Sequence, residues 1–244
     1  DRVRTDPPLD GPRSHQELWE AVGRTITEEG LGGESALAAF ADHLAPACLS
    51  TDHPRFLSFV PGAPTNASVL FDLVVGASAM CATSWLEAAG TVYAENQALR
   101  WVADLVGLPE GAGGCFASGG TMGNLSALIA GRDHAMRRRE ADGSGRPVRW
   151  AVVASDGAHS SIDSAARVMD VDVLLATTGD DRRLRGEAVR AAIAARPEGT
   201  EVFAVVATAG TTNLGVVDAL GEVADAAAEH GAWFHVDGAY GGAA

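Results

Sequence analysis

The chain has 244 residues, of which 47% are hydrophobic and 20% charged, and its formal net charge is −14. This size and composition suit one large domain, or one domain with a small appendage. The negative charge disfavours nucleic-acid phosphates and anionic membrane surfaces as partners. No apolar run approaches the ~20 residues of a membrane-spanning helix, and residues 1–12 do not resemble a signal peptide. We therefore expect a cytoplasmic protein.

The basic and sulfur-containing residues exclude several kinds of site. All 18 basic residues are arginine, so a Walker-type phosphate loop, which needs a lysine, is excluded. An enzyme whose covalent chemistry uses a lysine of this chain is excluded as well. Cys48, Cys81 and Cys115 are widely spaced, which indicates reduced, buried thiols. The seven histidines show no HxxxH or HExxH spacing, so we expect no metal site.

Residues 1–62 read as an N-terminal helical arm that ends in a loop. Ser14 can cap a helix, with Glu17 three residues later completing a capping box. A second helix is expected over Ser35–Leu44. The segment 52–64 is rich in proline and aromatic residues, which is typical of an ordered loop.

Residues 63–244 alternate between helical and strand patterns, which predicts an α/β fold with a largely parallel sheet. Gly107 and Pro109 should end the second of the helices. The strand segments are continuous apolar runs, as in a sheet covered on both faces, and ligands of such sheets bind at the carboxyl ends of strands. The expected helices are 66–80, 87–107, 121–139, 160–169, 186–196 and 219–230, and the expected strands are Arg149–Ala154, Val171–Ala176, Val202–Ala207 and Trp233–Val236.

Two polar motifs precede helices in this region. The glycine-rich segment Ala117–Asn124 leads into a helix whose free N–H groups suit a phosphate, although an ordinary helix cap would look the same. The segment Ser155–Ile162 places His159 at a strand's carboxyl end, where an imidazole can stack on an aromatic ligand or move a proton. A structural histidine is the alternative.

Two further motifs follow strands. The segment Ala207–Gly215 supplies small residues and hydroxyls, and by itself is a polar turn. In His235–Gly242, Asp237 directly follows an apolar strand, where a buried carboxylate needs a cationic partner. A capping aspartate is the alternative. Together the four motifs offer a phosphate cradle, a stacking ring, hydroxyls and a buried acid, which is the set that pyridoxal 5'-phosphate (PLP) requires.

The chain resembles the group II PLP-dependent amino-acid decarboxylases from about His53 to its last residue. The resemblance is carried by the segments SGGTMGN (118–124), AHSS (158–161), ATAGTT (207–212) and HVDGAYGG (235–242). It implies the large domain of PLP-dependent transferase fold type I, a homodimer, and decarboxylation of an L-amino acid to the amine and CO2.

The resemblance also implies roles for individual residues. The phosphate would be held by Gly119, Gly120 and Thr121. The pyridine ring would lie between His159 and Ala239, with its nitrogen on Asp237 and Thr208 at its edge. Asp237 and His159 would be the catalytic residues. The substrate-facing residues would be Phe59, Val60, Pro61, Thr83 and Trp85.

The lysine that binds the cofactor in this family lies downstream of the HVDxAY segment, and this sequence stops at Ala244. The first interpretation is an N-terminal portion, incomplete at its C-terminus, with a further segment or chain that supplies the lysine. The second is a non-catalytic PLP-binding or regulatory subunit. An aminotransferase, a cysteine desulfurase or an aldehyde-forming relative would use the same aspartate, and an aromatic, acidic or diamino substrate remains open.

Overall fold

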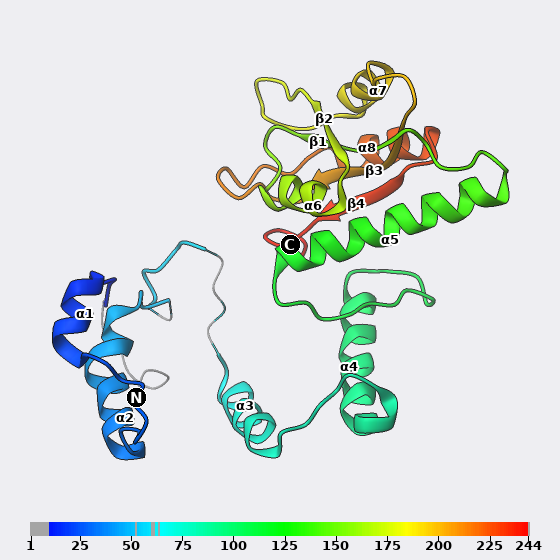
Figure 1. Cartoon of the computed structure of the whole chain (residues 1–244). Coiled ribbons are helices and arrows are strands. Elements are labelled where there is room, and N and C mark those ends of the chain that lie inside the picture. Colours follow the sequence, from blue (N-terminus) through cyan, green and yellow to red (C-terminus); the bar gives the residue numbers. More distant parts are fainter. Residues whose placement is uncertain (1–9, 52, 60–61, 63, 244) are drawn as a thin grey trace. The chain divides into compact units, whose positions relative to one another are not determined.

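The computed structural model describes residues 10–51, 53–59, 62 and 64–243. The chain divides into two compact units, Asp1–Val92 and Tyr93–Ala244 (Figure 1). No helix in the described part of the chain is both long and apolar enough to cross a membrane.

The first unit is helical, as its sequence predicts. Ser14 and Glu17 form the expected capping box: the Ser14 hydroxyl accepts from the Glu17 N–H at 3.3 Å, and the Glu17 carboxylate accepts from the Ser14 N–H at 2.7 Å. The helix expected over 35–44 is split, because its last part is π-helical. The elements are α1 (His15–Val22), α2 (Gly33–Ala39), the π-helical turn Phe40–Leu44, the 3-10 turn Ala45–Ala47 and α3 (Asn66–Ser78).

Helix α4 (Trp85–Leu105) begins in the first unit and ends in the second. Ala88 has non-helical dihedral angles, which kink the helix near its start. Gly107 follows the helix with φ +72°, a left-handed conformation that favours glycine. The expected stop at this glycine is therefore confirmed.

The second unit has three layers built around four parallel strands in the order β2-β1-β3-β4. Successive side chains of β1 enter opposite cores: Val152 and Ala154 pack with α5 and α6, whereas Ala151 and Val153 pack with α7 and α8. This arrangement confirms the predicted α/β class. The strands are β1 (Arg149–Ser155), β2 (Asp172–Ala176), β3 (Thr200–Thr208) and β4 (Trp233–Asp237), and the helices are α5 (Gly120–Ala141), α6 (Ser161–Met169), α7 (Gly186–Ala194) and α8 (Leu220–Glu229).

The two central strands and the two outer strands differ in burial. β3 is buried at every position except Glu201, and β1 is buried from Ala151 onward. The outer strands carry exposed side chains, namely Leu175 on β2 and Trp233 on β4. The expected sheet with two covered faces is thus correct for the centre and wrong for the edges, where the helices leave part of each strand open.

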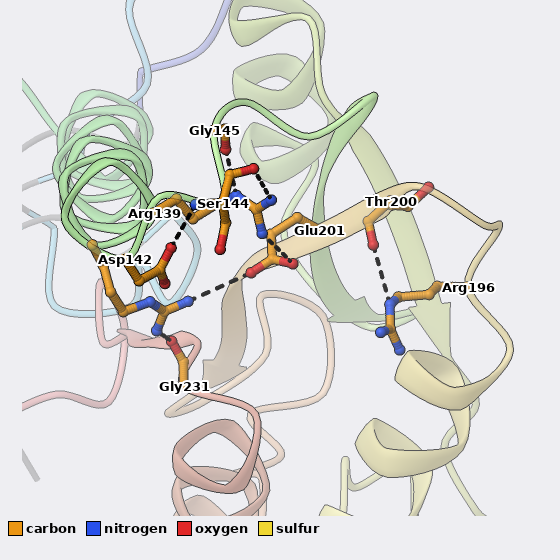
Figure 2. A network of polar contacts seen from close by, with 9 residues as sticks. Arg139, Asp142, Ser144, Gly145, Arg196, Thr200, Glu201 and Gly231 are labelled. Atoms are coloured by element: carbon orange, nitrogen blue, oxygen red, sulfur yellow. Dashed lines mark hydrogen bonds and ion pairs between the residues drawn. The ribbon is translucent and has the colours of Figure 1, made fainter.

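Two arginines at the end of α5 bind groups at the amino-terminal ends of the strands (Figure 2). Glu201, near the start of β3, pairs with Arg138 at 3.5 Å and with Arg139 at 3.2 Å. Arg139 Nε also donates to the Gly145 carbonyl at 2.8 Å, and Arg138 donates to the Gly231 carbonyl. These contacts therefore lie at the amino-terminal ends of the strands, whereas the polar motifs lie at the carboxyl-terminal ends.

The three cysteines are free, but the expectation that they are buried is wrong. Cys48, Cys81 and Cys115 are all exposed. Cys48 follows a 3-10 turn, Cys81 lies between α3 and α4, and Cys115 lies between α4 and α5. None of these connecting segments contributes to the two cores, so their small apolar side chains are not enclosed.

Candidate active site

Asp237 and Thr208 end the neighbouring strands β4 and β3, and they are register partners in the parallel ladder. Both are buried. Asp237 Oδ2 accepts from Asn124 Nδ2 at 2.9 Å, and Oδ1 accepts from the Ala239 N–H at 3.1 Å. A carboxylate offers about four lone-pair sites, so Asp237 can still accept a donor from a ligand.

The backbone of Thr208 is held by a hydrogen bond, and its hydroxyl is buried. Its N–H donates to Asp218 Oδ2 at 2.7 Å, and Asp218 Oδ1 accepts from the Leu184 N–H at 2.8 Å. Burial raises the pKa of Asp218, against the lowering effect of these two N–H donors. Thr208 Oγ1 is buried and has no hydrogen-bond partner among the described residues. An unpaired buried hydroxyl is costly, so this atom fits a ligand acceptor or donor.

The glycine-rich segment brings the start of α5 against the turn after β4. Gly119 has φ +137°, and α5 begins at Gly120 without a side-chain cap. A Cβ placed on Gly120 would lie only 2.9 Å from Ala239 Cβ, so this close approach requires glycine. The N-cap residue Gly119 offers the first N–H groups of the helix no side-chain acceptor, and Thr121, in the same turn, is exposed. Such a helix end suits a phosphate.

His159 joins the same site through Ser161. His159 Nδ1 lies 2.9 Å from Ser161 Oγ and accepts from the Ser161 N–H at 3.1 Å. Ser161 Oγ accepts in turn from Asn124 Nδ2 at 2.9 Å, and this amide also binds Asp237. The structure therefore places all seven predicted cofactor-binding residues at one end of the sheet: Gly119, Gly120, Thr121, His159, Thr208, Asp237 and Ala239.

A small pocket of about 190 Å³ also lies beside His159. Its walls come from β1, β2 and α6, and include Asp156 and Asp163. Gly120, Thr208, Asp237 and Ala239 do not line it. His159 therefore belongs both to this pocket and to the group of polar residues around Asp237.

Several residues that hold the site together by hydrogen bonds have no role predicted from the sequence. Asn124 and Ser161 link Asp237 to His159, and His235 Nε2 lies 2.8 Å from Asn124 Oδ1. Burial lowers the pKa of His235, although the nearby Asp237 carboxylate opposes this effect. The spacing of the sequence could have indicated two of these residues. Asn124 lies one helical turn after Gly120, and His235 lies two residues before Asp237, on the same strand face.

The predicted substrate-facing residues belong to the first unit. Phe59 and Trp85 are exposed there, and the Thr83 hydroxyl donates to Glu87 Oε2 at 2.6 Å. The bonds from Thr83 and Ser84 hold the pKa of the Glu87 carboxyl below its ordinary value. Val60 and Pro61 lie outside the described residues. A substrate contact by this set stays a prediction.

The sequence profile described as "Pyridoxal-dependent decarboxylase conserved domain" matches residues 21–244. The chain belongs to the pyridoxal-dependent decarboxylase family. It is 34% identical to an aromatic-L-amino-acid decarboxylase of Bacillus atrophaeus over 92% of this chain and 46% of the relative. It is 33% identical to an L-2,4-diaminobutyrate decarboxylase of Rhizobium meliloti (strain 1021) over 89% and 43%. The resemblance inferred from the four motifs is therefore confirmed.

Solved structures agree with this assignment. The crystal structure of Oryza sativa TDC with PLP and tryptamine superposes with a TM-score of 0.84 at 28% identity, over 96% of this chain and 53% of that one. This likeness confirms the fold type I large domain. The chain spans about half the length of the relatives it matches.

PLP is the cofactor of the family, and the site fits it on structural grounds. Thr208 Oγ1 is a buried polar atom without a partner in the described part of the chain. The Gly120–Ala239 approach leaves no room for a side chain, and α5 starts without a side-chain cap. Each feature suits a flat, phosphorylated ring beside Asp237.

Proposed function

We propose that the complete protein containing this chain removes CO2 from an L-amino acid and releases the amine, using PLP. The observation that carries the proposal is that buried Asp237 and Thr208 end neighbouring strands, with Asp237 bonded to Asn124 of α5 and the Thr208 hydroxyl without a hydrogen-bond partner among the described residues. A buried carboxylate is most stable when it faces a cation. The pyridine nitrogen of PLP becomes such a cation when it holds a proton.

Each residue of the proposed site has a distinct task. Gly119, Gly120 and Thr121 bind the phosphate through the start of α5. His159 and Ala239 hold the two faces of the ring. Asp237 keeps a proton on the ring nitrogen, and Thr208 donates or accepts at the ring edge.

The residues beside the ring act by holding charge and geometry. PLP, when bound, supplies the electron sink that makes loss of CO2 feasible. Asp237 strengthens that sink, because an ionised carboxylate favours the protonated ring nitrogen. His159 can hold the substrate or return a proton to it. These 244 residues contain no lysine, so we propose that a further segment or chain supplies the covalent anchor for PLP.

The assembly is proposed to be a homodimer. Helix α3 is apolar, and Leu70, Phe71 and Leu73 are each more than 60% exposed. An apolar helix of this kind is normally covered, and a second copy of the chain is the partner that the family suggests. The cytoplasmic location remains a prediction from the sequence.

The substrate is the open part of the proposal, because the matched relatives include enzymes named for aromatic amino acids and for diaminobutyrate. The test is to incubate the complete protein and PLP with a panel of L-amino acids and to measure CO2, amine and aldehyde. Equimolar CO2 and amine from one class of substrate supports the proposal. Aldehyde in place of amine supports the aldehyde-forming alternative, and PLP binding without turnover of any substrate supports a non-catalytic subunit.

A further inference from the structure

Asn124 is buried on α5 and makes three side-chain hydrogen bonds to two other elements. Its Nδ2 lies 2.9 Å from Asp237 Oδ2 on β4 and 2.9 Å from Ser161 Oγ on α6. Its Oδ1 lies 2.8 Å from His235 Nε2 on β4. Both N–H donors of the amide and one lone pair of its oxygen are therefore used by neighbours in the candidate site.

The chemistry of these partners fixes the orientation of the amide. An ionised carboxylate only accepts hydrogen bonds, so the NH2 group must face Asp237. The carbonyl oxygen then faces His235, which must carry a proton on Nε2 to donate to it. Burial lowers the pKa of His235, so its neutral form with the proton on Nε2 meets this requirement near pH 7.

The same amide acts on His159 through one hydroxyl. Ser161 Oγ accepts from Asn124, which leaves the Ser161 hydroxyl proton for His159 Nδ1 at 2.9 Å. The Ser161 N–H also points at Nδ1, at 3.1 Å. An N–H can only donate, so Nδ1 is an acceptor and the proton of the neutral imidazole sits on Nε2.

We propose that Asn124 is a positioning residue that orients the Asp237 carboxylate for the ring nitrogen of PLP and aligns the Ser161 hydroxyl with His159. This inference rests on the proposed role of Asp237 in PLP binding. The Asn124 amide donates to Asp237 Oδ2, and the Ala239 N–H donates to Oδ1, so the two bonds together fix the plane of the carboxylate. Asp237 and His235 are the titratable groups within hydrogen-bond reach of the amide, and His159 lies one hydroxyl away.

Two substitutions separate this role from simple packing. Asn124→Asp keeps the shape but replaces the donor by a second carboxylate about 2.9 Å from Asp237. Asn124→Ala leaves a cavity but adds no charge. If Asn124 only fills space, the Asn124→Asp variant should bind PLP more tightly than the Asn124→Ala variant. The positioning role predicts the opposite order at alkaline pH, because two close carboxylates repel each other.

The readout is the PLP dissociation constant of the complete protein between pH 8 and pH 6. At pH 8 we expect Asn124→Ala to bind PLP on the order of ten-fold more weakly than wild type, and Asn124→Asp on the order of 100-fold more weakly. On acidification only Asn124→Asp should recover, because the carboxylate pair takes up a proton that restores a donor to Asp237. The reverse order of the variants, or a flat pH profile, would overturn the proposal.

A second pair of variants guards against misfolding. Ser161→Ala removes one acceptor of the Asn124 amide, and we expect PLP affinity to fall several-fold. Ser160→Ala is the matched control, because its side chain makes no capping bond, and its affinity should equal wild type. Equal affinities for Ser161→Ala and Ser160→Ala would count against the proposal.

PLP-free protein provides a test that does not depend on the proposed function. The melting temperature of Asn124→Asp should rise relative to wild type as the pH falls from 8 to 5, because the folded carboxylate pair gains a proton. If wild type fails to bind PLP but this shift is seen, the proposed function fails and the Asn124–Asp237 contact stands. Parallel melting curves would show that the contact is wrong.

Discussion

Thr208 and Asp237 are register partners at the ends of neighbouring parallel strands, and the Asp237 side chain accepts hydrogen bonds from Asn124 and from the Ala239 N–H. The Thr208 hydroxyl is buried without a partner among the described residues. A buried hydroxyl left unpaired costs on the order of 1–3 kcal/mol. A ligand that bonds to it recovers part of that free energy, so the pair favours ligand binding at this point of the sheet.

Thr208→Val should therefore separate folding from binding. Valine keeps the shape and removes the unpaired hydroxyl, so the free energy of unfolding of the PLP-free protein should stay within about 1 kcal/mol of wild type or rise. PLP affinity should fall roughly ten-fold. Denaturant melts and PLP titration measure the two quantities.

Thr211→Val is the contrasting variant for the stability measurement. Thr211 Oγ1 accepts from the Val216 N–H at 3.1 Å, so its loss should destabilise the PLP-free protein by about 1 kcal/mol. Equal destabilisation by Thr208→Val and Thr211→Val would show that the Thr208 hydroxyl is already satisfied without a ligand.

Gly120→Ala should weaken PLP binding through a steric clash. The new methyl group would lie 2.9 Å from Ala239 Cβ and push the start of α5 away from the turn after β4. We expect a loss of affinity on the order of ten-fold or more, as typical overpacking costs about 1–3 kcal/mol. The double variant Gly120→Ala with Ala239→Gly should recover part of the loss.

Gly221→Ala is the control for the glycine substitution. Gly221 lies on α8, has no strained φ, and a Cβ there meets nothing within 4 Å. Its PLP affinity should match wild type. The steric explanation fails if Gly120→Ala also binds PLP like wild type, or if the double variant is no better than the single one.

His235→Gln should remove part of the pH dependence of folding. The folded pKa of His235 lies below its ordinary value, so the unfolded chain binds more protons as the pH falls below about 6.5. His235 therefore makes the free energy of unfolding fall on acidification. Glutamine cannot titrate but can still donate to Asn124 Oδ1. Denaturant melts between pH 8 and pH 5 should show a flatter profile for the variant, and parallel profiles would contradict the argument.

Charge on α3 should disturb the proposed dimer. Phe71→Glu and Leu73→Glu each place a carboxylate on an exposed apolar helix, and burying it unpaired costs several kcal/mol. We expect sedimentation to show a dimer for the wild type and a shift to monomer for these variants. Phe71→Leu is the apolar control. A dimer in every variant would place the interface elsewhere.

The α/β class and most elements follow from the sequence, because the apolar runs and glycine stops are local signals. The strand that begins at Arg149 and the helix stop at Gly107 illustrate this. The site residues that lie in the family motifs at the strand ends were predictable from the sequence. The Asn124 bridge was not, because it joins residues up to 113 positions apart, and such pairings depend on packing between elements. The exposure of Cys81 was missed for a similar reason, since burial is not a local property.

Asp237 is proposed to keep a proton on the ring nitrogen of PLP. The most direct measurement is the 15N NMR shift of ring-labelled PLP bound to the complete protein, compared between wild type and Asp237→Asn. We expect a protonated ring nitrogen in wild type and an unprotonated one in the variant, with decarboxylation falling on the order of 100-fold or more. The same shift in both proteins would contradict it.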